Sequence, residues 1–475
     1  MYFKKLYFII LFFLFRGLLL AQGSHVLTLK QSVDLGIKNN LAVRQSALLA
    51  ENSEINLKQS KAGILPTIAA NINHGSNQGR SIDPFTNSYI DQSILFGNYN
   101  LGASVILLNG GLIKNLIRQN QINYEAGKME AKAAKDNLTL NIILSYLQVL
   151  SNQDLLKQAN TQAELTTKQV ERLETLNKEG AIVPAQLYDL KGQLANDQLT
   201  VINSTNQLEA SKLALTQLMN IPFDPQLELT PVDIGSEVSL YSDQPATIFK
   251  TALGNFSQIQ AAAFRVKLAS AEIAVAKSGL YPQLSLSGGL STNYSNAAAR
   301  DILIDTKQVP SGDYVSVNGN QYPVITSKSN FNTQKIPYAN QFANNYNTSV
   351  SINLHIPILN AFQARTRIAL AKNDLRNYKY IEESQKNQLQ QGIEQAYFNM
   401  TASLKRYNKL QEQVEDFIQS FKSAEIRFNN GVITQVDYLV AKNNLDRSRT
   451  NLITSRYEYL FQTKILDYFK GILVL

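Results

Sequence analysis

The segment KAGILPTI at residues 61–68 recurs as KSGLYPQL at residues 277–284. In both copies a helix-compatible stretch runs into a Gly-x-x-Pro break, and alternating apolar and polar residues follow. Proline cannot continue a helical hydrogen-bond ladder, so Pro66 and Pro282 mark the ends of two helices. The pair predicts a helix-to-strand unit that occurs twice in the chain.

Comparison of the chain with itself extends this duplication to two long blocks. Residues 32–68 align without gaps onto 248–284, at an offset of 216, and residues 109–220 align onto 360–471, at an offset of 251. Chance seldom produces two long ungapped blocks in the same order. The offsets differ by 35 residues, so we expect an insertion in a loop of the second copy, roughly over 292–346.

The first residues predict a secretory signal over 1–21, because Lys4 and Lys5 precede an apolar run that ends at a small residue. A membrane-anchor helix is the alternative, although the run is short for a span of about 20 residues and Arg16 interrupts it.

The mature part of the chain, 22–475, is predicted to be one unit made of two structural repeats. The repeats cover about 28–220 and 246–471, and a linker rich in proline, aspartate and glycine joins them at 221–245.

Each repeat contains two short segments in which apolar and polar residues alternate, the pattern of a strand with one apolar face. The predicted strands lie near 66–73, 99–108, 282–290 and 348–358. About ten residues of alternation suit a transmembrane strand, and a half-buried sheet of a soluble protein has the same pattern. Four strands are too few for a closed membrane barrel, and an open edge in lipid leaves backbone groups unpaired. If the strands lie in a membrane, the chain must therefore oligomerise.

Most of the remaining chain is predicted to be helical. Residues 112–178 contain no proline and predict a helix of about 100 Å at about 1.5 Å per residue. Helices over about 187–219 and 246–279 together match that length, so we expect them to stack end to end, antiparallel to the long helix. The helices at 438–470 and 28–62 should form the equivalent pair, and apolar residues at 3–4 spacing predict coiled-coil packing.

Composition excludes several classes of function. The chain has no cysteine, which excludes disulfides, thiolate catalysis, cysteine-based zinc sites and a lipidated N-terminal cysteine. The three histidines are too scattered for a metal site, and no nucleophile, base and acid cluster together, so we predict no metal, no cofactor and no enzyme activity. The 45 basic and 37 acidic residues are dispersed, without the basic run that a nucleic-acid partner requires.

These features, in this order, resemble the outer membrane efflux protein family, whose members are TolC-like. The residues that carry the resemblance are LKQSVDLGIKNN at 29–40, KAGILPTI and KSGLYPQL, LLNGG at 107–111, and two helix tips, RLETLNKEGAIVPAQLYDL at 172–190 and RFNNGVITQVDYL at 427–439. The resemblance covers nearly all of the mature chain.

The resemblance implies a fold of long antiparallel coiled-coil helices that form a periplasmic α-barrel, with four transmembrane β-strands per chain and twelve in a homotrimer. It implies an outer-membrane channel subunit in contact with outer-membrane lipid, with a large periplasmic part and no covalent chemistry. Such a channel is a passive exit duct of a tripartite efflux pump or a type I secretion system. Its partners are a periplasmic adaptor protein and an inner-membrane pump of the RND, ABC or MFS type.

Two glycines, Gly180 and Gly431, end the two descending helices, where glycine is the usual residue for a left-handed turn. A plain helix-turn-helix explains them, and the resemblance adds that these tips form the periplasmic entrance and the adaptor-docking surface. An exposed apolar tip is typical of a partner site. We expect six exposed contacts beside the glycines: Ile182, Val183, Pro184, Val432, Ile433 and Thr434.

Asp437 lies six residues after Gly431, where the resemblance implies an acidic residue that can face the pore. Three copies would form a ring that attracts cations. The second acidic position of the family, nine residues after the glycine, is Val440 here, whereas the first copy has Asp189 at that spacing. Asp437 and Asp189 are therefore candidates for a pore constriction. A solvated helix N-terminal residue, favoured by the helix dipole, is an equal alternative for Asp437.

A cell-surface structural coiled-coil protein without transport activity is the main alternative function. It explains the heptads and the abundance of Asn and Gln, but not the paired alternating segments at matched positions. An enzyme would require a compact pocket, which long helices do not provide.

Overall fold

The computed structural model describes residues 26–82, 87–91, 93–232 and 241–472, so the secretory signal predicted at 1–21 lies outside the described residues. The chain divides into two compact units, which are described separately. One unit, here called the strand unit, comprises residues 57–119 and 271–371, and the other described residues form the helical unit.

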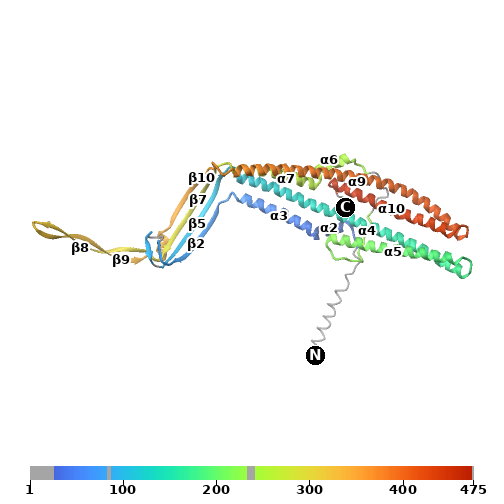
Figure 1. Cartoon of the computed structure of the whole chain (residues 1–475), viewed down its shortest axis with the longest axis horizontal. Helices are drawn as coiled ribbons and strands as arrows, with labels where there is room; N and C mark the ends of the chain where they lie inside the picture. The colour runs from blue at the N-terminus through green and yellow to red at the C-terminus, as the bar shows by residue number, and fades with distance from the viewer. Residues whose placement is uncertain (1–25, 83–86, 92, 233–240, 473–475) are drawn as a thin grey trace, which may run out of the picture. The chain divides into compact units, whose positions relative to one another are not determined.

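The strand unit contains a four-stranded antiparallel sheet in the order β10-β7-β5-β2 (Figure 1). Its strands are β2 (Thr67–Asn77), β5 (Ile94–Asn109), β7 (Gln283–Ser295) and β10 (Asn347–His355). The strands β2 and β10 lie at the two edges, so each has one side without a neighbour in this sheet.

The strands differ from the predicted ones mainly at their outer ends. The pairing of β2 with β5 continues to Asn77 and Ile94, beyond the ends predicted at 73 and 99. The sequence pattern ends early because Gly, Ser and Asn follow, but a backbone ladder does not require apolar side chains.

The insertion predicted as a loop over 292–346 is instead a long β-hairpin followed by a short helix, which corrects that prediction. The hairpin consists of β8 (Ala299–Val317) and β9 (Asn320–Lys335), and the helix is α8 (Tyr338–Asn344). Asn318 and Gly319 both have positive φ, 53° and 82°. Two successive positive φ values are what a tight hairpin turn requires, and Asn-Gly is the preferred sequence for it. A smaller hairpin, β3 (Arg80–Ile82) with β4 (Tyr89–Asp91), lies in the corresponding loop of the first repeat.

Two long helices, α4 (Leu112–Lys178) and α9 (Gln363–Asn429), contain 67 residues each. Each is followed by a shorter one, α5 (Pro184–Met219) and α10 (Gln435–Phe469). The remaining helices are α2 (Leu29–Asn39), α3 (Leu41–Ala62), α6 (Pro245–Asn255) and α7 (Ser257–Ser278). Among the described residues, no helix has the length and apolar character needed to cross a bilayer.

The helices predicted at 28–62 and 246–279 are each broken at one residue, Asn40 and Phe256. The two breaks are equivalent under the offset of 216. The Oδ1 atom of Asn40 accepts hydrogen bonds from the backbone N–H groups of Ala42 and Val43, which caps the start of α3. Phe256 is buried against two aromatic rings at the end of α10.

The helical unit has two main apolar cores, one for each repeat. Tyr146 lies in the first, where its hydroxyl donates to the carbonyl oxygens of Leu27 and Thr230, at 2.9 and 2.7 Å. These carbonyls flank a short parallel pairing of β1 (Val26–Leu27) with β6 (Glu228–Leu229). Burial raises the pKa of Tyr146 to about 12, so it remains a neutral donor. The second core surrounds Met400 and Ile393 of α9.

Candidate functional site

The first candidate surface is the sheet of the strand unit, which has two chemically different faces. Residues that lie opposite each other in an antiparallel pair point to the same face, and successive residues alternate. One row of opposed residues is Thr67, Ser104, Ser287 and Ser351. Their hydroxyls pair at 2.9 Å between Thr67 and Ser104 and at 2.7 Å between Ser287 and Ser351.

The neighbouring rows of this face carry mainly Asn, Ser and Gly, so we call it the polar face. It is hollowed by a shallow groove of about 390 Å³. The residues that line the groove have no ionisable side chain: Thr67, Ala69, Asn71, Asn100, Gly102, Ala103, Ser104, Ser287, Gly288, Gly289, Ser349 and Ser351.

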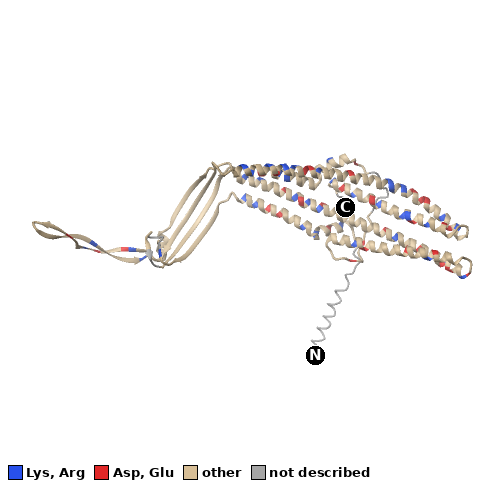
Figure 2. Ribbon diagram, in the orientation of Figure 1, with Lys and Arg blue, Asp and Glu red and all other residues tan. Residues whose placement is uncertain are grey.

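The opposite face of the sheet is apolar. Ile72, Val350 and Ile352 are among its residues and are 75%, 80% and 67% exposed, so none of the residues that the structure describes covers them. The strands β2, β5, β7 and β10 contain no Lys, Arg, Asp or Glu, whereas such residues are frequent along the helices (Figure 2). An uncharged sheet with one apolar and one polar face is the pattern of strands between lipid and a water-filled lumen.

Aromatic residues cluster where the short helix α8 packs against β5 and β7. The Tyr99 and Tyr338 hydroxyls lie 3.0 Å apart, and the Tyr294 ring packs against that of Tyr338 at 4.9 Å between centroids. Phe342 of α8 lies beside Tyr99. Aromatic girdles occupy such positions at the membrane interface, because a tyrosine has an apolar ring that suits lipid and a polar hydroxyl that suits water.

The second candidate surface consists of the two helix tips, where Gly180 and Gly431 have φ of +71° and +70°. In the first tip, Ala181 donates to the Leu176 carbonyl and Gly180 to that of Asn177. The second tip has the same two hydrogen bonds. Val432 donates to the carbonyl five residues before it, and Gly431 donates to the carbonyl three residues before it. This is the Schellman arrangement, in which a glycine in the left-handed region ends a helix.

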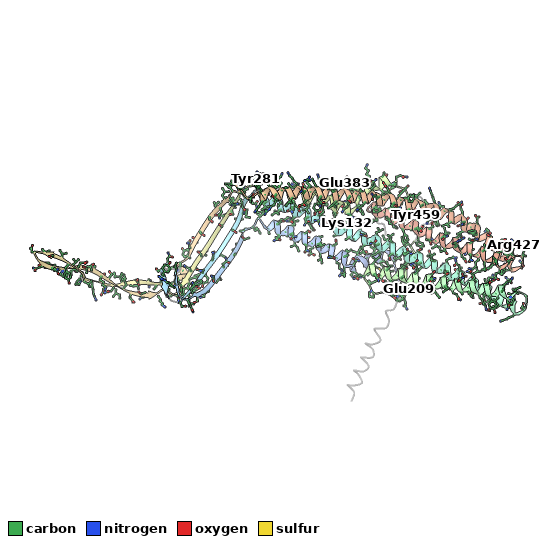
Figure 3. The ribbon with its side chains drawn as sticks, viewed as in Figure 1. Lys132, Glu209, Tyr281, Glu383, Arg427 and Tyr459 are labelled. Carbon is green, nitrogen blue, oxygen red and sulfur yellow. The ribbon has the colours of Figure 1, made fainter. Side chains whose placement is uncertain are left out.

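The two tips lie side by side in the helical unit. Arg172 of α4 donates from Nη2 to the carbonyl oxygen of Asn429 in α9 at 2.8 Å. Leu439 of α10 packs against a cluster formed by α4 and α5, which includes Leu173 and Leu187. Figure 3 shows Arg427 close to the tip that ends α9.

The predicted tip residues fall into three groups. Val183 and Val432 are 63% and 65% exposed, as expected for contacts. Ile182 and Ile433 are half-buried against the clusters between the helices, which corrects the expectation that they are exposed.

The last two predicted tip residues, Pro184 and Thr434, lie where α5 and α10 begin. Pro184 is the first residue of α5, where its missing N–H costs nothing, and Thr434 caps α10. The prediction missed Tyr188 and Val436, which are 69% and 66% exposed just beyond the tips. Their spacing from the glycines offered no signal of its own.

Asp437, the first constriction candidate, is exposed and closes a capping box with Thr434. Thr434 donates to Asp437 Oδ2 from its hydroxyl at 2.7 Å and from its backbone N–H at 3.2 Å. These hydrogen bonds hold the pKa of Asp437 below its usual range. The helix-terminal alternative is thus the local role of the residue, and a pore-facing role is compatible with it. Asp189, the second candidate, is exposed on α5.

A buried charged network, which the sequence analysis did not identify, connects α5 with α10. Lys442 donates from Nζ to Asp197 at 3.0 Å and to Asp446 at 2.7 Å. Thr166 and Gln193 donate to the same Asp197 carboxylate at 2.6 and 2.7 Å. Burial raises the pKa of Asp446. Sequence reasoning missed the network because Asp197 and Lys442 are far apart in the chain.

Comparisons with known proteins agree on one family. Residues 33–220 and 308–466 match the sequence profile of the family described as Outer membrane efflux protein. TolC of Escherichia coli strain K12 is 21% identical over 458 residues, which cover 93% of this chain and 81% of that protein. TolC of Vibrio cholerae is 24% identical over 339 residues, which cover 69% of this chain and 66% of that protein.

Solved structures show the same fold. The outer membrane protein VceC of Vibrio cholerae superposes with a TM-score of 0.72 at 14% identity, covering 93% of this chain and 96% of that one. The CmeC outer membrane channel of Campylobacter jejuni gives 0.71 at 16% identity, covering 93% and 85%. These likenesses confirm the predicted TolC-like fold class of long helices with β-strands.

Proposed function

The chain belongs to the outer membrane efflux protein family, and on this premise we propose that three copies of it join their strands into one barrel and serve as the exit duct of an export pump. As a member it is an outer-membrane efflux channel of the TolC type with a periplasmic extension, and it is not an enzyme. The assembly, partners and cargo are the parts that we propose.

One observation carries the proposal: the four-stranded sheet is uncharged, two-faced and unpaired along β2 and β10. An edge strand in lipid must be paired, because no water is present to satisfy its backbone groups. Pairing of β2 in one copy with β10 in the next satisfies both edges. Three copies contribute twelve strands, which places the apolar face toward lipid and the polar face toward the lumen.

The helix tips support a periplasmic adaptor as the partner. Val183 and Val432 are exposed beside the tip glycines, and Tyr188 and Val436 extend the apolar surface along the first turns of α5 and α10. Exposed apolar side chains gathered at helix tips are typical of a protein interface. The adaptor would connect the channel to an inner-membrane pump of the RND, ABC or MFS class, in a tripartite efflux pump or a type I secretion system.

Asp437 supports a selective constriction at the entrance. Its lowered pKa keeps the carboxylate charged, and three copies around the axis would attract cations and repel anions. Asp189 is the second candidate, on the neighbouring tip. The alternative of a cell-surface coiled-coil protein without transport lacks an explanation for the two-faced sheet, and membership of the efflux family decides against it.

The proposal is tested by deleting the gene and complementing it with the intact chain. We expect the deletion to increase accumulation of at least one member of a panel of dyes, metal ions and secreted proteins, and complementation to reverse it. The outer-membrane fraction should contain trimers whose gel mobility changes on heating. An elongated protein that is soluble without detergent, with unchanged accumulation across the panel, would overturn the proposal.

A further inference from the structure

The hairpin β8–β9 is the largest feature of the strand unit that the proposed function leaves unexplained. It joins the sheet at its outer end, where β7 leads into β8, and Ile336 after β9 donates to the Ala298 carbonyl at 3.0 Å. Among the described residues, β8 and β9 pair only with each other, as one ribbon (Figure 1). An isolated two-stranded ribbon is at best marginally stable in water, so a ribbon of this length needs a further contact.

The register of β8 and β9 assigns the side chains of the ribbon to two faces. On one face Leu303 lies opposite Phe331, and Pro310 lies opposite Ile325. The two intervening pairs on that face carry only hydroxyl and amide side chains, namely Thr306 with Ser329 and Gln308 with Ser327. We call the face between Leu303 and Ile325 the uncharged face. Its Leu303, Ile325 and Phe331 are 54%, 52% and 56% exposed, so no part of the described chain covers them.

The opposite face of the ribbon is charged. Lys307 lies opposite Lys328, and Asp305 beside them accepts a hydrogen bond from its partner Asn330 at 2.7 Å. Lys307 also pairs with Asp305 at 3.2 Å. Between Leu303 and Pro310 the charged residues lie on one face, so the other face of this stretch is the one suited to a contact. Beyond the stretch, Asp301 returns a charge to that second face.

We propose, resting on the trimer proposed above, that the uncharged faces of the three hairpins pack against one another at the outer mouth of the channel. The occupant is therefore a second and third copy of the same ribbon. Three sheets that close one barrel bring their outer ends around one axis, and each outer end carries a hairpin on the same strands. The interface is thus continuous with the proposed pairing of β2 and β10.

The two faces of the ribbon fit this arrangement better than other partners. An uncharged face with isolated apolar pairs matches a copy of itself, because apolar side chains meet apolar ones and hydroxyl and amide groups meet their own kind. The Thr306 and Ser329 hydroxyls pair with each other at 3.3 Å, but the Gln308 amide would lose its hydrogen bonds to water in lipid. In the closed bundle the charged faces, with Lys307 and Lys328, point outward to water.

Thiol crosslinking tests the inference, because the chain has no cysteine of its own. Ile325→Cys lies on the uncharged face, and Thr326→Cys, the next residue, lies on the charged face and is the matched control. On intact cells, a short bismaleimide should convert a large fraction of Ile325→Cys into boiling-resistant dimers, at least fivefold more than of Thr326→Cys, because one thiol per chain can link only two copies. Equal crosslinking of both variants, or none of Ile325→Cys, would overturn the inference.

The trimer itself is monitored separately in the same samples. Heat-sensitive trimers and normal export in both variants show that the proposed function stands, so failed crosslinking then counts against the hairpin contact alone. A crosslinked band of another size would identify a different partner and also overturn the inference. As a second measurement, Phe331→Lys should increase trypsin cleavage at the hairpin lysines on intact cells several-fold, whereas Asn330→Lys should not.

Discussion

Lys442 of α10 and Asp197 of α5 form an ion pair of 3.0 Å although both side chains are almost completely buried. The pair joins the two helical hairpins of the chain, because α5 belongs to the first repeat and α10 to the second. Asp446, Thr166 and Gln193 complete the hydrogen bonding around it. A buried charge keeps its place only while its partners remain, so this contact is more sensitive to substitution than an exposed ion pair.

Replacement of Lys442 by methionine should destabilise the helical unit by about 3–5 kcal/mol, because Asp197 and Asp446 would remain buried without a positive partner. The measurement is the thermal unfolding of the detergent-purified protein. Lys191 is the matched control, since it occupies the equivalent position in the first repeat at the offset of 251. Its pair with Glu174 is exposed at 44% and 42%, so Lys191→Met should leave the unfolding temperature nearly unchanged. Equal losses for the two variants would contradict a special role of burial.

The pair of Lys442 with Asp197 also shows why the sequence predicted some features and not others. The Gly-x-x-Pro breaks, the alternating strands and the tip glycines are local patterns, and local patterns constrain the backbone directly. The pairing of Lys442 with Asp197 depends on how two helical hairpins meet, which no local pattern encodes. The breaks at Asn40 and Phe256 were missed for a similar reason, since asparagine and phenylalanine are also common within helices or loops.

The hairpin illustrates a prediction that failed on composition. Residues 292–346 are rich in Asn, Ser and Tyr, which favoured a loop, yet Asn318-Gly319 is a tight-turn sequence flanked by residues able to pair. At the tips, the sequence located the turning glycines but not which neighbours are exposed. Ile182 and Ile433 are half-buried because the two hairpins pack against each other there.

Gly431→Val should reduce export strongly while trimers remain in the outer membrane. A Cβ at Gly431 would meet no atom within 4 Å, so the harm comes from its φ of +70° and not from a clash. A β-branched residue is strained in that region by about 1–2 kcal/mol and should shift the tip. Gly431→Asn is the control, because asparagine tolerates left-handed φ, and it should retain export. Dye accumulation measures the effect, and full export by Gly431→Val would argue against a docking role of the tip.

The cation preference of the channel should depend on Asp437, whose carboxylate is charged at neutral pH. Hydrogen bonds from Thr434 lower the pKa of Asp437, whereas the two other carboxylates of the proposed ring would raise it. Reversal potentials in planar bilayers measure the preference. Asp437→Asn should abolish it at neutral pH.

Thr434→Val removes the hydroxyl donor and should move the loss of cation preference to higher pH, because the pKa of Asp437 then rises. An unchanged midpoint would show that the measured preference has another origin. The same recordings on Asp189→Asn decide whether the second candidate also faces the pore, since only a pore-facing carboxylate should alter the ratio.

Two adjacent residues of β10 test the assignment of the sheet faces. Val350 is 80% exposed on the apolar face, and Ser351 lies on the polar face, where its hydroxyl pairs with that of Ser287 at 2.7 Å. A lysine on the lipid side of a barrel costs about 2–4 kcal/mol near the bilayer midplane, whereas a lysine in the lumen remains hydrated.

Val350→Lys should therefore strongly reduce the amount of heat-sensitive trimer in the outer membrane, and Ser351→Lys should leave it nearly unchanged. The ratio of folded to unfolded bands in outer-membrane fractions measures both variants under the same conditions. The opposite order would mean that the apolar face lines the lumen, and the pairing of β2 with β10 between copies would then have to be reconsidered.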